Sequence, residues 1–292
     1  MATIRPRRSV LYMPGSKERA LEKGKELQTD AIIFDLEDAV APDMKDMARQ
    51  QVQAAISAGG YGNRELVIRV NGIDTPWFEE DLKAAANANP DAILVPKVSS
   101  GSEVEDVRQK LIALGAKPEV DLWAMMETPL AMLQAKDIAA AGPAESHRLR
   151  AFVMGTNDLA KETGAVITPG RLPMLSWLST CVAAGRAYGI DIIDGVYNDF
   201  KNEDGFKKEC EEGRDLGMDG KTLIHPAQLA PSNEVFSPSS EAVDWARKII
   251  AAFEQPENQG KGAITVDGKM VELLHAEMAK RTVAKADAIE SL

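Results

Sequence analysis

The feature that most constrains the fold of this chain is a repeated alternation between short, largely apolar segments and amphipathic helical segments. The apolar segments are four or five residues long and recur eight times. Such an alternation is typical of a parallel β-sheet whose strands are joined by helices, and eight strands predict closure into an α/β fold of the (β/α)8 (TIM) barrel type. The expected strands are Ser9–Met13, Ala31–Phe34, Leu66–Val70, Ala92–Val95, Leu122–Met126, Ala151–Met154, Ile190–Ile193 and Lys221–Ile224.

The pattern changes after the last expected strand. Ser237-Pro238 begins another amphipathic helix, and residues 255–262 have the composition of a flexible linker. Asp267-Gly268 then predicts the tight turn of a hairpin, followed by a charged helix. We therefore expect residues 1–254 to form the barrel and residues 263–292 to form a small unit that docks on its own barrel or on a neighbour's, because so short a tail cannot hold a core of its own.

Composition narrows the classes of function. The chain has 292 residues, of which 45% are hydrophobic and 27% are charged, enough for one large core. Its net charge of -11 argues against a general binder of nucleic acids or anionic membranes. The sequence shows neither a charged-then-apolar leader nor an apolar run of about twenty residues, so we expect a cytoplasmic protein.

The cysteines and histidines do not show metal-binding spacings. Cys181 and Cys210 lie in helical patterns, and we expect reduced, partly buried thiols. His147, His225 and His275 lack the helical spacing of a histidine metal site, and we expect His225 to be a hydrogen-bonding residue near the barrel mouth.

Two acids follow expected strands and predict a metal site. Glu127 ends the strand Leu122–Met126, and Asp158 comes three residues after Gly155, where the next apolar run stops. Either acid could be only the N-cap of the following helix. Together they point to a pocket, because ligands of parallel barrels bind at the carboxyl ends of the strands. Two carboxylates, completed by water and substrate oxygens, suit Mg²⁺.

Most other strands also end in polar residues. Arg69 lies among the apolar residues Val67, Ile68 and Val70, so its guanidinium must lie close to the sheet and needs an anionic partner. The alternative to a functional role is a structural ion pair with Glu37 or Asp38. The polar residues expected at the mouth are Asp35, Glu37, Asp38, Arg69, Asn71, Lys97, Asp194 and His225.

Several motifs resemble one family. They are Arg8–Ser16, Phe34–Val40, Val67–Asn71, Pro96-Lys97, Glu127–Pro129, Gly155–Leu159, Leu223–Pro226 and Asn233–Pro238. In this order they are similar to the citrate lyase β-subunit-like enzymes of the HpcH/HpaI aldolase superfamily, which include malyl-CoA, β-methylmalyl-CoA and citramalyl-CoA lyases. The resemblance implies a Mg²⁺-dependent enzyme that cleaves or forms a carbon–carbon bond in a 3-hydroxyacyl-CoA, giving an acyl-CoA and a 2-oxo acid such as glyoxylate or pyruvate.

The resemblance assigns roles at the mouth. Glu127 and Asp158 are expected to be the direct Mg²⁺ ligands. Glu37 and Asp38 are expected to hold the water molecules of the metal or to orient Arg69. Mg²⁺ would act as Lewis acid on the oxo-acid half of the substrate, and Arg69 would stabilise the enolate oxygen of the other half.

The resemblance also gives the C-terminal unit a role. Residues 263–292 are similar to the lid of the family, in which the aspartate, here Asp267, reaches the active site of an adjacent subunit as acid/base. This implies a homotrimer or homohexamer in which each active site is shared between two subunits.

A CoA substrate needs a basic site for its phosphates. Basic residues cluster around the first strand, and Ser16 with the following helix N-terminus could accept a phosphate, although a solvated basic arm remains the alternative. The residues expected to bind substrate or CoA are Arg8, Ser16, Lys17, Arg19, Arg69, Lys97, Thr128 and Pro129, with Arg5 and Arg7 in the same basic cluster.

Three other functions stay open beside the lyase. The same scaffold could hydrolyse the thioester of malyl-CoA, which would release the free hydroxy acid and CoA. It could be a citrate lyase β subunit acting on an acyl-carrier-protein thioester, although a lid over the mouth argues against so large a partner. It could also be a non-catalytic CoA-binding protein.

Overall fold

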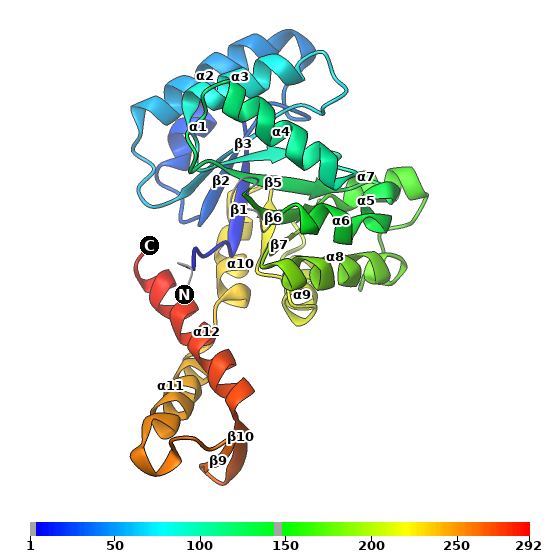
Figure 1. Cartoon of the computed structure of the whole chain (residues 1–292). Helices are drawn as coiled ribbons and strands as arrows, with labels where there is room; N and C mark the ends of the chain where they lie inside the picture. Colours follow the sequence, from blue (N-terminus) through cyan, green and yellow to red (C-terminus); the bar gives the residue numbers. More distant parts are fainter. Residues whose placement is uncertain (1–3, 143–147) are drawn as a thin grey trace. The chain divides into compact units, whose positions relative to one another are not determined.

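The computed structural model describes residues 4–142 and 148–292, and its largest part is a closed barrel of parallel strands (Figure 1). The strands follow one another around the barrel in chain order, and β8 pairs with β1 to close it. They are β1 (Ser9–Pro14), β2 (Ala31–Asp35), β3 (Glu65–Arg69), β4 (Ala92–Val95), β5 (Asp121–Met126), β6 (Leu149–Met154), β7 (Asp191–Asp194) and β8 (Gly220–Leu223). Each expected strand is present with its ends shifted by at most two residues, and the (β/α)8 barrel is confirmed.

Side chains at alternate strand positions fill the interior of the barrel. The buried cluster inside includes Val10, Ile33, Val67, Leu94, Trp123, Met125, Val153 and Ile193. A barrel of this size has a packed core rather than a pore, so a ligand can bind only beyond the last apolar layer. Two residues further along β2 and β3 the inward positions carry Asp35 and Arg69, which are register partners. Asp35 and Arg69, at these last inward positions, therefore make the carboxyl end of the barrel polar.

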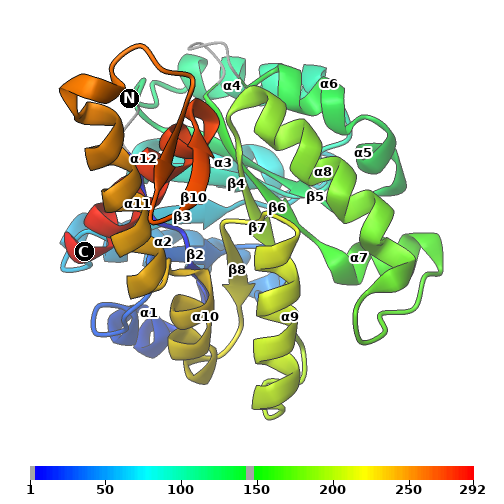
Figure 2. The ribbon, with the colours of Figure 1, turned by 90° about the horizontal axis from the view of Figure 1, so that it is seen from below.

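Helices surround the barrel on its outer side (Figures 1 and 2). They are α1 (Glu18–Gly24), α2 (Lys45–Ala58), α3 (Phe78–Ala88), α4 (Gly101–Ala113), α5 (Pro129–Leu133), α6 (Ala135–Ala140), α7 (Thr156–Thr163), α8 (Leu175–Tyr188), α9 (Glu203–Asp215) and α10 (Leu229–Phe236), with 3₁₀ turns η1 (Pro42–Met44), η2 (Leu172–Met174) and η3 (Pro226–Gln228). Neither candidate metal ligand is a helix N-cap. Thr128 caps α5 by accepting from the Ala131 N–H, and Gly155 is the N-cap of α7, which places Asp158 in the first turn of that helix.

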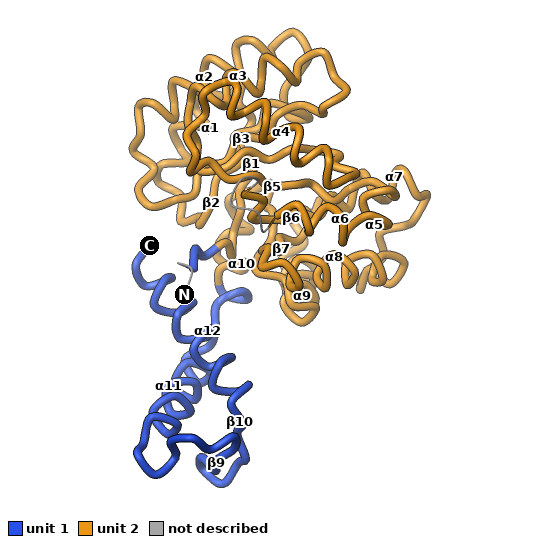
Figure 3. Tube along the Cα trace, viewed as in Figure 1, with its two compact units in different colours: residues 1–6, 234–292 blue, residues 7–233 orange. Residues whose placement is uncertain are grey.

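The chain divides into two compact units (Figure 3). The barrel unit is residues 7–233, and the small unit is residues 1–6 and 234–292. The small unit contains α11 (Ser240–Glu254), η4 (Pro256–Asn258), the antiparallel strands β9 (Ala263–Val266) and β10 (Lys269–Glu272), and α12 (Leu273–Glu290). Asp267 and Gly268 have φ values of 48° and 77°, the left-handed conformation that a tight hairpin turn requires, so the predicted hairpin is confirmed.

The unit boundary differs from the one that the sequence predicts. Composition puts it at residues 255–262, but α11 belongs to the same compact unit as the C-terminal segment. Ala246 and Ile249 of α11 share one buried cluster with Ile264, Val266, Val271, Ala276 and Ala279. Residues 255–262 therefore connect two parts of the same small unit, because the apolar face of α11 is what gives the hairpin and α12 a core.

Two further expectations concern burial. Cys181 and Cys210 are free, as the sequence predicts, and they are fully rather than partly buried. Burial raises the pKa of both thiols to about 12. Across residues 4–142 and 148–292, none of the helices combines the length and apolar character needed to span a bilayer.

Candidate active site

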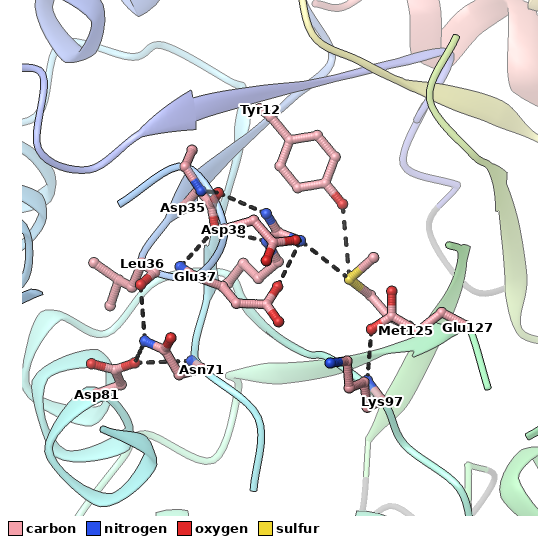
Figure 4. Close-up of polar contacts among 12 residues, drawn as sticks. Tyr12, Asp35, Leu36, Glu37, Asp38, Asn71, Asp81, Lys97, Met125 and Glu127 are labelled. Atoms are coloured by element: carbon pink, nitrogen blue, oxygen red, sulfur yellow. Dashed lines mark hydrogen bonds and ion pairs between the residues drawn. The ribbon is translucent and has the colours of Figure 1, made fainter. Parts of the chain in front are cut away.

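A cavity of about 300 Å³ lies at the carboxyl end of the barrel. Its walls come from the ends of β1, β2, β3, β5 and β6 and from the segments that follow β6, β7 and β8, and Figure 4 shows the polar contacts on one side of it. The cavity lies at the lower end of the range for small-molecule sites, so it suits a small acyl group rather than a whole CoA molecule. Among its lining residues are Tyr12, Asp35, Asp38, Arg69, Met125, Glu127, Gly155 and Asp158.

Arg69 is the centre of an ion-pair cluster in this cavity. Its Nε and Nη2 donate to the two carboxylate oxygens of Asp35, both at 2.7 Å. Its Nη1 lies 2.7 Å from Glu37 Oε2 and 3.5 Å from Asp38 Oδ2. The main partner is thus Asp35, rather than Glu37 or Asp38, because Asp35 and Arg69 are register partners at the ends of adjacent strands.

Burial raises the pKa of both Asp35 and Glu37, but their partners lead to opposite net shifts. Burial favours a neutral Asp35, but Arg69 and two backbone N–H groups hold the pKa of Asp35 below its usual range. At Glu37 burial dominates over Arg69, and the neighbouring carboxylates of Asp38 and Asp35 add to it, so that the pKa of Glu37 rises to about 7. Asp35 is therefore the ionised anchor of the guanidinium.

The two expected metal ligands line the same cavity. Glu127 is 2% exposed, and its Oε1 accepts from the backbone N–H of Lys97 at 2.8 Å. Burial, with the carboxylates of Glu37 and Asp158, raises the pKa of Glu127 to about 8. The other side of the Glu127 side chain lies against Gly155, where an added Cβ would be 2.4 Å from Glu127 Oε2. Any side chain at position 155 would therefore collide with Glu127, so glycine is required here to leave room for the carboxylate.

The donor set fits Mg²⁺. Two oxygen ligands from the protein leave the remaining positions of the shell to water and substrate, which is the usual arrangement for this ion. In the parts of the chain that the structure describes, no group of three or more His, Cys, Asp or Glu side chains is arranged to hold a metal. A dication would favour the ionised form of Glu127, against the burial and the neighbouring carboxylates that raise its pKa.

The structure gives less support to the other residues that are expected to bind substrate at the mouth. The Lys97 side chain is exposed. Partial burial of its ammonium lowers the pKa of Lys97, but the carboxylates of Asp158 and Glu127 outweigh this and raise it. The ammonium group therefore interacts with the acidic cluster. Thr128 uses its hydroxyl to cap α5 and to hydrogen-bond Ser99 at 3.0 Å, and Pro129 is exposed in the first turn of α5. Thr128 and Pro129 do not line the cavity.

The basic cluster around β1 divides between the two ends of the barrel. Ser16, Lys17 and Arg19 follow the carboxyl end of β1, and Lys17 and Arg19 are exposed. Arg8 precedes the strand and therefore lies at the opposite end, where its guanidinium donates to Asp30 at 2.8 Å. Arg7 is buried beside it against Glu65 and Asp191. CoA binding by Arg8 stays a prediction, and the position of Arg8 before β1 does not favour it, because ligands of such barrels bind at the carboxyl ends of the strands.

Asp267, His225 and His275 lie outside this cavity lining. Asp267 belongs to the small unit, where its exposed carboxylate pairs with Lys248 at 2.9 Å. His225 Nδ1 accepts from the Ala227 N–H at 3.2 Å, and its ring stacks on Phe200, which agrees with the expected hydrogen-bonding role. His147 is outside the described residues.

The sequence analysis does not assign roles to some residues of the site. Asp35 is recognised only as one of several polar residues, whereas Tyr12 and Met125 are not assigned at all. The period-two pattern is the signal that could find them, because inward positions alternate from Val10 to Tyr12 and from Trp123 to Met125.

Lys45 carries no comparable signal in the sequence. It is 4% exposed, and its Nζ donates to the carbonyls of Leu36 and Glu37, both at 2.7 Å, and to Asn71 Oδ1 at 2.8 Å. It therefore holds the backbone of the segment that carries Glu37.

A packed parallel barrel whose strands end on an acidic cavity has the architecture of a (β/α)8 barrel enzyme. The chain belongs to the HpcH/HpaI aldolase/citrate lyase family, whose model matches residues 8–226. This confirms the family that the motifs indicate.

Relatives of the chain act on CoA thioesters. A protein named (3S)-malyl-CoA thioesterase from Cereibacter sphaeroides is 54% identical over 284 residues, covering 97% of this chain and 96% of the relative. A protein named L-malyl-CoA/beta-methylmalyl-CoA lyase from the same species is 35% identical over 311 residues, covering 98% and 96%. Among solved structures, protein CitE from Mycobacterium tuberculosis in complex with magnesium, acetoacetate and coenzyme A is similar with a TM-score of 0.72, at 26% identity, covering 94% of this chain and 97% of that one.

Proposed function

We propose that this chain is a Mg²⁺-dependent enzyme that hydrolyses the thioester of malyl-CoA to malate and CoA. The observation that carries the proposal is the meeting, in one small cavity, of a carboxylate pair suited to Mg²⁺ and a buried arginine. The choice of hydrolysis over carbon–carbon cleavage is supported by the 54% identity to a protein named malyl-CoA thioesterase, compared with 35% for one named lyase.

The charge balance of the site supports a need for the cation. Five carboxyl groups stand in or beside the cavity against three cations, Arg69, Lys97 and Lys45, so a dicarboxylate-derived substrate would enter a region with an excess of negative charge. When bound, Mg²⁺ would serve as Lewis acid and template for the carboxylate and hydroxyl oxygens of the malyl group. The five carboxyl groups are Asp35, Glu37, Asp38, Glu127 and Asp158.

In this proposal Glu127 and Asp158 hold the ion, and the N–H of Lys97 orients Glu127. Arg69 faces the thioester carbonyl and stabilises the negative charge that develops on its oxygen. The two bonds from Asp35 keep the guanidinium in one orientation, so little reorganisation is needed during the reaction.

Proton transfer is assigned to Asp267, in line with the family resemblance. Because Asp267 pairs with Lys248 in the structure, this role requires that ion pair to open. We further propose that the lid spans residues 263–292 and serves an adjacent subunit in a homotrimer or homohexamer. Light scattering on the purified protein measures the oligomeric state directly.

Cleavage of malyl-CoA or citramalyl-CoA to an acyl-CoA and a 2-oxo acid is the second candidate. The 35% identity to a lyase that covers nearly the whole of both chains favours it, and the same cavity would serve it, since an enolate oxygen takes the place of the hydrolytic oxyanion. Arg69 would act in the same position in both reactions.

Product analysis tests the proposal. The protein is incubated with malyl-CoA and citramalyl-CoA of both configurations, with Mg²⁺ or with a chelator, and CoA, acyl-CoA and the acids are separated and identified. We expect free malate with CoA, and no turnover in chelator. Glyoxylate with acetyl-CoA would establish the lyase instead, and activity only on an acyl-carrier-protein thioester would indicate a citrate lyase β subunit.

A further inference from the structure

Tyr12 occupies a position in the cavity that the proposed mechanism has not used. It is the inward residue of β1 that follows Val10, and its side chain packs on the apolar core of the barrel. It lines the cavity together with Arg69, Met125 and Glu127. The aromatic ring therefore rests on the core while its hydroxyl group reaches the polar mouth.

Tyr12 and Arg69 form one structural element. The guanidinium carbon of Arg69 lies 4.8 Å from the centroid of the Tyr12 ring, which is the geometry of a cation–π contact. Asp35 holds the same guanidinium from another direction through its two 2.7 Å hydrogen bonds. The phenol and the guanidinium are therefore positioned together.

Both groups direct a donor at the same weak acceptor. The Tyr12 hydroxyl lies 4.0 Å from Met125 Sδ, and a dashed line in Figure 4 marks this contact. Arg69 Nη1 lies 3.8 Å from the same sulfur. Within the described residues, the Met125 thioether is the hydrogen-bond acceptor of the Tyr12 hydroxyl. Sulfur is a poor acceptor, and a half-buried phenol normally finds a better one. Two donors thus converge at the edge of the cavity on an acceptor that is weaker than an oxygen atom.

The phenol is suited to act as a donor. Burial raises the pKa of Tyr12; Arg69 opposes the shift, and the carboxylates of Asp35 and Glu127 support it. The hydroxyl therefore keeps its proton at neutral pH and can donate a hydrogen bond.

We propose that Tyr12 is a catalytic residue whose hydroxyl, together with the Arg69 guanidinium, donates a hydrogen bond to the thioester carbonyl oxygen of the substrate. This inference rests on the proposed function only in that the substrate is a thioester. It holds whether the C–S bond or the carbon–carbon bond of the substrate breaks. In hydrolysis, water adds to the carbonyl carbon and the carbonyl π electrons move to oxygen. They return when the C–S bond breaks, and a proton from water ends on the CoA sulfur. In carbon–carbon cleavage, the electrons of the breaking bond end on the same oxygen as an enolate. The carboxylate assigned to proton transfer, Asp267, takes the proton of the substrate hydroxyl, and a proton returned to the enolate carbon gives the acyl-CoA.

The test is Tyr12→Phe, which keeps the ring beneath Arg69 and removes only the donor. Loss of one oxyanion donor typically costs about 10²–10³ in kcat, so we expect a fall of roughly 100-fold with little change in KM or in Mg²⁺ affinity. The matched control is Tyr61→Phe, because Tyr61 is buried, donates to the Leu21 carbonyl at 3.0 Å and lies outside the cavity lining. Its kcat should stay within about twofold of the wild-type value.

A second measurement does not require turnover. A CoA ketone analogue, in which CH₂ replaces the thioester sulfur and the carbonyl carries ¹³C, is bound to each protein, and its carbonyl stretch is recorded by infrared difference spectroscopy. We expect a lower frequency in the wild type and in Tyr61→Phe than in Tyr12→Phe.

The outcomes separate the two proposals. A Tyr12→Phe enzyme with wild-type kcat and an unchanged carbonyl frequency would overturn the role of Tyr12 while leaving the function intact. A wild-type protein that binds the analogue with a Tyr12-dependent shift, yet turns over neither malyl-CoA nor citramalyl-CoA, would overturn the function and keep Tyr12 as a carbonyl donor. Failure of the wild-type protein to bind the analogue, together with no turnover of either substrate, would overturn both.

Discussion

Replacing Asp35 with asparagine tests whether one buried ion pair holds the mouth of the barrel together. The side chain of Asp35 is 1% exposed and accepts two 2.7 Å hydrogen bonds from Arg69. Asparagine keeps the shape, but it removes the charge and turns an acceptor oxygen into a donor that faces the guanidinium. Removing one partner of a buried pair costs about 3–5 kcal/mol. Glu37 stays 2.7 Å from the guanidinium and offsets part of this, so we expect a loss of about 2–4 kcal/mol of unfolding free energy.

Asp38→Asn is the matched control, since it makes the same chemical change opposite the same arginine. The Asp38 side chain is 70% exposed and lies 3.5 Å from Arg69, and exposed pairs of this kind contribute about 0.2–1 kcal/mol. In a barrel of this size each kcal/mol shifts Tm by about 2–4 °C, so Asp35→Asn should lower Tm by roughly 5–15 °C and Asp38→Asn by less than about 4 °C. Calorimetry and urea unfolding at pH 7 measure both. Equal losses in the two variants would refute the assignment of Asp35 as the anchor.

The same pair makes a prediction about pH. Burial works against the ionised carboxylate, yet Arg69 holds the pKa of Asp35 below its unfolded value, so the folded state binds this proton less readily. The stabilisation is therefore fully present above the unfolded pKa of about 3.9 and is lost as the pH falls through the lower folded pKa. The difference in unfolding free energy between the wild type and Asp35→Asn should be constant near neutrality and shrink below about pH 4. A difference that grows on acidification would contradict this sign.

Three further predictions concern the reaction. Glu127→Gln and Asp158→Asn should each abolish Mg²⁺ binding in calorimetric titration while leaving the metal-free fold intact, since both side chains lie at the mouth beyond the apolar core; unchanged Mg²⁺ affinity in both would remove them from the metal site. Arg69→Lys should lose about 100-fold or more in kcat with a smaller change in KM, because an ammonium cannot bond both oxygens of Asp35 and still face a substrate oxygen; near wild-type kcat would leave Arg69 with a structural role only. Inactive Asp267→Ala and Glu127→Ala chains should regain part of the activity when co-expressed, if each lid serves a neighbouring barrel; verified mixed oligomers without activity would show that the lid acts on its own barrel or that Asp267 is not catalytic.

The strands and the inward face of the site follow from the sequence. Strands of four to six residues with helices between them are encoded locally, since side-chain alternation and apolar runs depend only on neighbours in the chain. The same alternation places Tyr12, Asp35, Arg69 and Glu127 on the inward side of their strands, and Glu127 follows its strand directly. The (β/α)8 barrel and the location of the candidate metal ligands at its mouth are therefore determined by patterns that need no tertiary information.

The tertiary structure decided which of these groups meet. Asp35, Glu37 and Asp38 are equivalent candidates in the sequence, and only the register between β2 and β3 makes Asp35 the partner of Arg69, 34 residues away. Packing likewise decided that α11 belongs to the small unit, although its amphipathic pattern fits the barrel helices equally well. An apolar stripe indicates that a helix face must be buried, but it does not indicate against which element. A buried acid likewise indicates that a cation is needed, but it does not indicate which one. Both choices depend on the distances that closure of the barrel and folding of the small unit impose on residues far apart in the chain.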